Sequence, residues 1–142
     1  MMAAASPGSR PDYLSFWFEA DDASLQPGDV LQLSVDGQMH KAVQGIGSAA
    51  AFAGVYAPGP KPKRSGRVRI PIAIAGVVPV RASGTHAVHG TPREIEVGTQ
   101  LGTSSKRAGF AVPDGYAFVG FALAGVPAGD EATIPVLLWH LL

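Results

Sequence analysis

The chain alternates short apolar runs with clusters of Gly, Pro and Asp, and this pattern favours β-structure over every other class. In the run Val30–Val35, apolar residues recur at every second position from Leu31 onward, as in a strand with one buried face. Asp36-Gly37 follows, and then the similar run Gln38–Val43, which together predict a β-hairpin. No segment keeps the apolar spacing of an amphipathic helix over two turns, so we expect an all-β protein.

Short strands recur at intervals of roughly 8–12 residues, which is typical of a β-barrel or a β-sandwich. The chain has 142 residues with 18 Gly and 12 Pro, which suits many tight turns. We expect Gly76 to be a bend between two separate strands. The expected strands are Tyr13–Phe18, Val30–Val35, Gln38–Val43, Phe52–Tyr56, Val68–Ile74, Val77–Ala82, Ile95–Val97, Phe110–Val112, Tyr116–Leu123 and Thr133–Trp139.

The two halves of the chain share a pattern that predicts two similar hairpin units. The spacing from Gly54 to Val68 is 14 residues, as is the spacing from Gly120 to Ile134. The glycine in each copy allows another backbone to approach closely. One unit cannot bury its apolar face alone, so we expect two to close a small barrel. The matched segments are Gly28-Asp29 with Gly98-Thr99, Gly37 with Gly109, Ala42-Val43 with Ala111-Val112, and Phe52–Tyr56 with Phe118–Phe121.

The N-terminal part differs in composition from the remainder, so we expect an extended arm over residues 1–18 and a barrel or sandwich domain over 19–142. Residues 1–12 are mostly small or polar, with two prolines. The next six, YLSFWF, hold four of the chain's 11 aromatic residues. They fit either a core strand or an anchor in a partner's groove, because aromatic side chains dominate interface energies. The candidate anchors are Tyr13, Phe16, Trp17 and Phe18.

Charge is segregated although the net charge is zero, with 11 basic and 11 acidic residues. Residues 11–29 hold five acids and no base, whereas residues 61–69 hold five bases and no acid. The balanced total argues against a general nucleic-acid partner. The basic run is either a solvated loop or a contact to an acidic protein surface, on a neighbouring copy or another protein. Its candidate contact residues are Lys61, Lys63, Arg64, Arg67 and Arg69, with Arg10 added from the arm.

The chain shows no motif that would hold a cofactor or perform catalysis, so we expect no cofactor, no metal and no enzymatic activity. Without cysteine, a thiolate nucleophile and a Cys-based metal site are excluded. His86 and His89 are three residues apart, but no third ligand is evident. The longest apolar stretch, residues 70–80, is broken by Pro and Gly and is shorter than the ~20 residues of a membrane helix. We therefore expect no membrane partner, and the first residues lack a secretory signal.

Six short glycine-containing segments share a pattern that is found in one group of β-proteins. They are Pro27–Val30, Asp36–Ala42, Ala53–Val55, Gly76–Arg81, Ile95–Leu101 and Val119–Leu123. Together they resemble the β-domains of tailed-phage structural proteins, and most closely those of head decoration (capsid cement) proteins. The resemblance covers residues 26–142, and Ile134–Leu138 looks like that family's final aliphatic strand. Thr99 departs from the family's pattern, which has Asp after Gly98.

The resemblance implies a non-enzymatic structural protein that binds between major capsid subunits and stabilises the shell. Its partners would be the major capsid protein and further copies of itself, most simply as a homotrimer. Such a protein would be made in the host cytoplasm and would reside on the outer capsid surface of the virion. The alternative is a tail-fibre, head-fibre or spike domain that binds a host receptor or glycan, with Phe110, Tyr116 and Trp139 as candidate platform residues.

Overall fold

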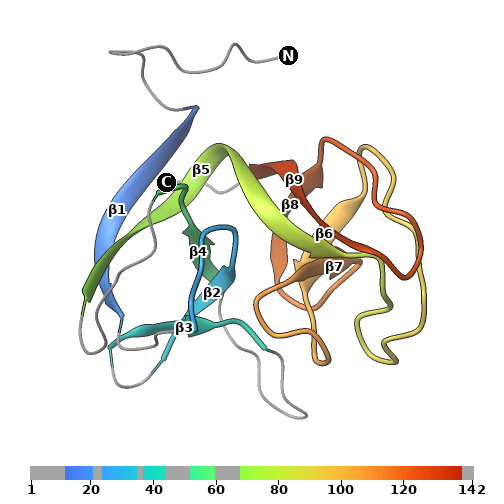
Figure 1. The fold of residues 1–142 in the computed structure, drawn as a ribbon, viewed down its shortest axis with the longest axis horizontal. Coiled ribbons are helices and arrows are strands. Elements are labelled where there is room, and N and C mark those ends of the chain that lie inside the picture. Colours follow the sequence, from blue (N-terminus) through green and yellow to red (C-terminus); the bar gives the residue numbers. More distant parts are fainter. Residues whose placement is uncertain (1–11, 21–23, 35–36, 44–51, 60–67, 139–142) are drawn as a thin grey trace.

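The computed structural model describes residues 12–20, 24–34, 37–43, 52–59 and 68–138, and within these residues it is all-β. The predicted fold class is confirmed: a closed five-stranded barrel carries additional strands (Figure 1). The strands are β1 (Tyr13–Ala20), β2 (Val30–Leu33), β3 (Met39–Lys41), β4 (Phe52–Tyr56), β5 (Val68–Ser83), β6 (Gln100–Thr103), β7 (Ala111–Pro113), β8 (Phe118–Ala122) and β9 (Glu131–Leu138).

The barrel closes because the second half of β5 pairs on both of its edges. It pairs antiparallel with β9 from Gly76↔Leu138 to Ser83↔Glu131, and parallel with β7 at Ala82↔Ala111. Strands β6 and β8 complete the circuit in the order β5-β7-β6-β8-β9-β5. Closure removes the free edges that an open sheet would expose.

One long strand, β5, replaces the two strands predicted at Val68–Ile74 and Val77–Ala82. Gly76 lies inside it with φ 94°, and a Cβ at this position would lie 2.7 Å from the Tyr13 Cα. The glycine therefore allows a local irregularity without ending the strand, because only glycine adopts positive φ at little cost. The first half of β5 pairs with β1 and β4, and the second half with β7 and β9.

Two units of the same topology follow one another along the chain, and we define unit 1 as residues 13–75 and unit 2 as residues 76–138. In unit 1 the pairs are β1–β5, β5–β4, β4–β2 and β2–β3. In unit 2 they are β5–β9, β9–β8, β8–β6 and β6–β7, with β5 now contributing its second half. Strand β1 of unit 1 therefore corresponds to the second half of β5, so the two hairpin units extend further than the sequence pattern indicated.

The registers of the two units agree residue by residue. Leu31 pairs with Gly54 and is followed by a register shift, and Leu101 pairs with Gly120 with the shift at the same place. The bond from the Gly28 N–H to the Tyr56 carbonyl, 2.8 Å, recurs between Gly98 and Ala122 at 2.7 Å. The turn before each hairpin recurs as well.

The matched strand glycines allow close packing in both units, as the sequence predicted. A Cβ at Gly54 would lie 2.7 Å from the Ala73 carbonyl oxygen, and one at Gly120 would lie 2.9 Å from Val136 Cγ1. One part of the predicted alignment is wrong: the register makes Met39, rather than Ala42, the equivalent of Ala111. The two alignments differ by three residues; the paired positions are six residues apart in the first hairpin (Leu33↔Met39) and eight apart in the second (Thr103↔Ala111).

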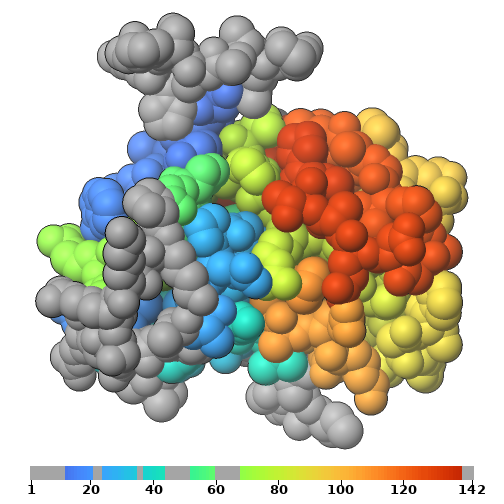
Figure 2. Space-filling view, viewed as in Figure 1, coloured from blue at the N-terminus to red at the C-terminus, as the bar shows by residue number. Residues whose placement is uncertain are grey.

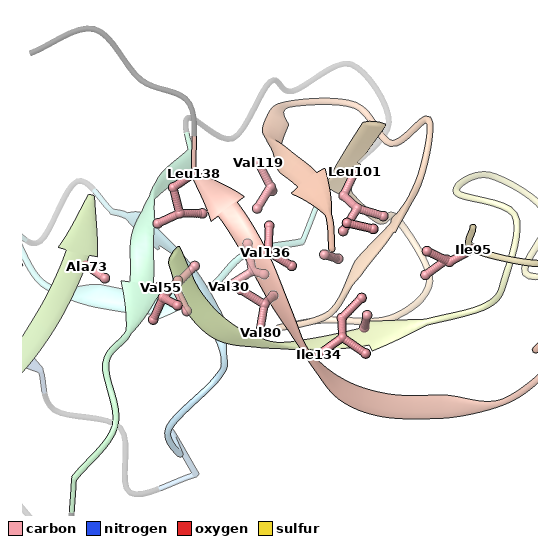
Figure 3. Packing of buried hydrophobic residues seen from close by; sticks show 14 of the residues in the cluster. Val30, Val55, Ala73, Val80, Ile95, Leu101, Val119, Ile134, Val136 and Leu138 are labelled. Atoms are coloured by element: carbon pink, nitrogen blue, oxygen red, sulfur yellow. The ribbon is translucent and has the colours of Figure 1, made fainter. Parts of the chain in front are cut away.

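The apolar residues form two buried clusters. The smaller lies in unit 1 and includes Leu31, Met39 and Tyr56. The larger fills the barrel of unit 2, but it also contains Val30 and Val55 from unit 1 (Figure 3). One face of unit 1 is therefore packed against unit 2, and the two units form a continuous body.

The remaining strand predictions differ in detail. Strand β6 was not expected, because Gln100–Thr103 contains no apolar alternation. The predicted strand at Ile95–Val97 is reduced to one isolated bridge, Ile95↔Val126. Val35, Asp36, residues 44–51 and Trp139 lie outside the described residues, and so do Asp21 and Asp22.

Candidate functional site

Strand β1 carries the densest group of exposed apolar side chains on the described surface. Leu14, Phe16, Trp17 and Phe18 are 44%, 48%, 60% and 39% exposed. Among the described strands β1 is hydrogen-bonded to β5 alone, so it forms an edge of the sheet. Its atoms lie at the left margin of the molecule (Figure 2). Exposed aromatic groups of this kind mark interaction sites in soluble proteins.

The register of β1 divides its aromatic side chains between the two sheet faces. Phe16 and Phe18 are opposite Ile72 and Ile70, which belong to the buried cluster of unit 1. Trp17 is opposite Pro71 and so projects from the other face. The predicted anchors Phe16, Trp17 and Phe18 are thus on the surface, whereas Tyr13 is half-buried and packs against the larger cluster.

The expected arm and the sheet overlap at this strand. The division at residue 18 falls inside β1, and Asp12 is also bound to the sheet because its carbonyl accepts the Val77 N–H at 2.9 Å. YLSFWF is therefore a paired strand of the sheet, and its role as an anchor stays a prediction. The backbone is paired as in a core strand, while three aromatic side chains remain exposed as in an anchor.

Only one residue of the predicted basic run lies within the described residues. Arg69 is exposed and stands directly opposite Glu19 in the β1–β5 register. This arrangement places a positive and a negative side chain on the same face as Trp17. The other predicted contact residues lie outside the described residues; they are Arg10, Lys61, Lys63, Arg64 and Arg67.

A buried ion pair joins the two units and was missed at the sequence level. The Asp29 carboxylate is fully buried; its Oδ1 accepts Arg81 Nη1 at 2.6 Å and its Oδ2 accepts the Gln26 N–H at 2.9 Å. Burial raises the pKa of the Tyr56 phenol above its ordinary value, and the negative charge of Asp29 raises it further. Asp29 therefore does not belong to a solvated acidic surface. Its place after Gly28 at a hairpin entry was the available signal.

The Arg81 side chain also lines a small hollow of about 180 Å³ in unit 2, together with Phe110 and the first residues of β9. The Arg81 guanidinium lies 4.2 Å from the Phe110 ring centroid, and the Arg107 guanidinium lies 5.4 Å from the same centroid. Arg107 also forms an ion pair with Glu131. Two cations on one ring use the aromatic face for packing. Phe110 is thus half-buried, whereas Tyr116 is 50% exposed; Trp139, the third expected platform residue, is outside the described residues.

The histidines of the described chain are engaged with their neighbours. His86 Nδ1 accepts the N–H groups of Val88 and His89, both at 3.2 Å, and the two imidazoles stack with centroids 4.9 Å apart. Within the described residues no three His, Cys, Asp or Glu side chains gather in a way that could hold a metal ion.

A second apolar surface lies on unit 2. Phe118, Phe121, Leu137 and Gln100 line an open hollow of about 440 Å³, in which the two phenylalanine rings meet edge to face at 5.3 Å. Sequence reasoning assigned these phenylalanines to a strand and predicted no surface there. Residues three apart in a regular strand project from opposite faces, so the sequence held no signal for this surface. The register shift between Leu101 and Gly102 brings both rings together.

No protein-family model, curated protein or solved structure matches the chain. In the part of the chain that the structure describes, no helix is long and apolar enough to cross a membrane.

Proposed function

We propose that this protein is a non-enzymatic structural protein that decorates a phage capsid and stabilises it by binding between major capsid subunits. The observation that carries the proposal is the exposed aromatic strand β1 at the edge of a closely packed β-body. Trp17 is the most exposed of its aromatic side chains, at 60%, and lies on the sheet face opposite Phe16 and Phe18. It suits the centre of a protein interface, where aromatic residues contribute most of the binding energy.

The physical role follows from linkage. A protein that binds only the assembled shell stabilises that shell, by an amount that grows with its concentration relative to the dissociation constant. A closed barrel with matched registers is suited to this role because it changes little on binding. The resemblance to head decoration proteins points to the same class, with a homotrimer as the form that binds and the outer capsid surface as its location.

The experiment is co-sedimentation of the purified chain with empty shells assembled from the major capsid protein of the same phage. We expect binding that saturates at a fixed ratio to capsid subunits. Trp17→Ser removes the most exposed aromatic side chain of β1 and should weaken binding at least tenfold, as expected for a hot-spot residue. Val97→Ser is the matched control, because Val97 is 70% exposed on another part of the surface.

Two results would overturn the proposal. One is the absence of binding to shells while the chain is folded, and the other is equal loss of binding in both variants. A tail-fibre or spike domain would instead bind a glycan or receptor, and the half-exposed Tyr116 favours that second candidate. A glycan-binding assay with Tyr116→Ala tests it directly.

A further inference from the structure

The two units have equivalent apolar faces, and the face of unit 1 is buried against unit 2. We call Val30, Val55 and Ala73 the joint face of unit 1. All three are fully buried and belong to the same cluster as the barrel residues of unit 2 (Figure 3). This face is therefore covered by the next unit along the chain.

The corresponding face of unit 2 has no such cover within the described chain. The register of the two units makes Gln100 the equivalent of Val30, Phe121 that of Val55, and Leu137 that of Ala73. We call Gln100, Phe121 and Leu137 the end face of unit 2. It is the open hollow of about 440 Å³ described above, and Phe118 corresponds to Phe52 beside it.

Two barrel residues that share the buried cluster with the joint face have exposed equivalents in unit 1. In unit 2, Val78 and Val80 share the cluster with the joint face and are fully buried. Their equivalents in unit 1 are Phe18 for Val80 and Phe16 for Val78. The register shows this, because Val80 pairs with Ile134 in unit 2 just as Phe18 pairs with Ile70 in unit 1. Phe16 and Phe18 are 48% and 39% exposed.

We infer that the end face of unit 2 docks against β1 of a second copy of this chain and so repeats between molecules the contact that joins unit 1 to unit 2 within one molecule. Both halves of that contact are present on one chain, and no other described residues cover either of them. The two surfaces differ from each other, so the contact is head-to-tail and closes into a ring when the rotation permits.

This contact specifies the self-association contained in the proposed function and rests on it to that extent, although its test needs no capsid.

One feature of the contact within the chain is not repeated between copies. The Asp29–Arg81 ion pair has Thr99 and Glu19 at the equivalent positions, so the contact between copies lacks this buried charge pair. We therefore expect it to be weaker than the contact within the chain.

Complementary variants test the head-to-tail geometry. Phe121→Glu disables the end face and Phe16→Glu disables β1, while Val97→Glu and Leu33→Glu place the same charge on exposed positions elsewhere. By sedimentation velocity we expect a ring for the unaltered chain and both controls, and a monomer for each disabled variant. A mixture of the two disabled variants retains one intact contact, so it should form a 1:1 dimer and nothing larger.

Cysteine pairing gives a second measurement that does not depend on disrupting apolar residues. The Arg81 N–H donates to the Gly28 carbonyl at 2.9 Å, which places residues 81 and 29 close together. The equivalent pair between copies is Glu19 and Thr99, in β1 and just before β6, which lie on opposite sides of the molecule (Figure 1). The chain has no native cysteine, so Glu19→Cys and Thr99→Cys chains, distinguished by mass, should form a mixed disulfide on oxidation.

Several outcomes would overturn the inference. They are a monomeric chain up to its solubility limit, oligomers that persist in both disabled variants, and Glu19→Cys chains that pair with themselves in preference to Thr99→Cys chains. The proposed function fails separately, when head-to-tail rings form but do not bind capsid shells. Circular dichroism on every variant verifies that a monomeric result reflects a lost contact rather than lost folding.

Discussion

Replacement of Asp29 tests how the two units are held together. Asp29→Ala removes the ion pair with Arg81 and the bond from the Gln26 N–H. Removal of one partner of a buried pair costs about 3–5 kcal/mol. The low end applies here, because the Arg81 side chain is 22% exposed and regains some hydration. The lost N–H bond adds about 1–2 kcal/mol, so we expect the free energy of unfolding to fall by about 4 kcal/mol.

The repeat supplies an internal control for this measurement. Thr99 stands at the position equivalent to Asp29, and its Oγ1 accepts the Glu96 N–H at 2.9 Å as Asp29 accepts that of Gln26. Asp29→Thr should therefore keep the turn bond and lose only the ion pair, for a cost of about 3 kcal/mol. Thr99→Ala loses only the turn bond and should cost about 1 kcal/mol.

Urea unfolding at pH 7 and 25 °C measures all three variants. With an m-value of about 2 kcal/mol/M, the Asp29→Ala midpoint should fall by about 2 M. A fall of less than about 1 kcal/mol for Asp29→Ala would refute the argument that the ion pair joins the units. Equal losses for Asp29→Ala and Asp29→Thr would refute the separate contribution of the turn bond.

Three further predictions concern other parts of the molecule. Gly102→Ala should lower stability by about 2–3 kcal/mol in urea unfolding, because its Cβ would lie 2.6 Å from the Gly115 carbonyl carbon. The pKa of the Tyr56 phenol is raised above 10.0 in the folded state, so the unfolded chain loses this proton first and the free energy of unfolding falls as the pH rises above 10. Tyr56→Phe removes this contribution, so the free energy of unfolding of the variant should fall less steeply above pH 10, by up to about 1.4 kcal/mol per pH unit. Deletion of residues 2–11 should change the melting temperature by no more than a few degrees, because Asp12 and β1 keep their backbone hydrogen bonds. The deletion should weaken binding to capsid shells in co-sedimentation. Unchanged binding would show that these residues do not contribute to it.

The class of fold was predictable because alternation and turn residues act locally. Asp36-Gly37 between two alternating runs was enough to place β2 and β3, and the Gly54 and Gly120 spacing revealed the repeat. The full extent of the repeat was not predictable. Strand β1 and the second half of β5 share almost no sequence, and only their pairing with Ile70 and Ile134 shows that they are equivalent.

The surfaces were harder to predict than the strands. The aromatic residues of β1 stood out in the sequence, but their exposure depends on the absence of a second paired neighbour among the described strands. The end face depends on three strands distant in sequence, which bring Gln100, Phe121 and Leu137 together. The sequence shows Asp29 only as one of five acids in residues 11–29, because its partner Arg81 is 52 residues away.

Quantitative co-sedimentation of the unaltered chain with assembled capsid shells and with unassembled major capsid protein tests the central claim most directly. The account predicts binding to shells alone, saturation at a fixed ratio to capsid subunits, and a higher temperature of shell disruption in the bound state. A folded chain that leaves the shells unbound, or that binds them without changing their stability, would contradict the account.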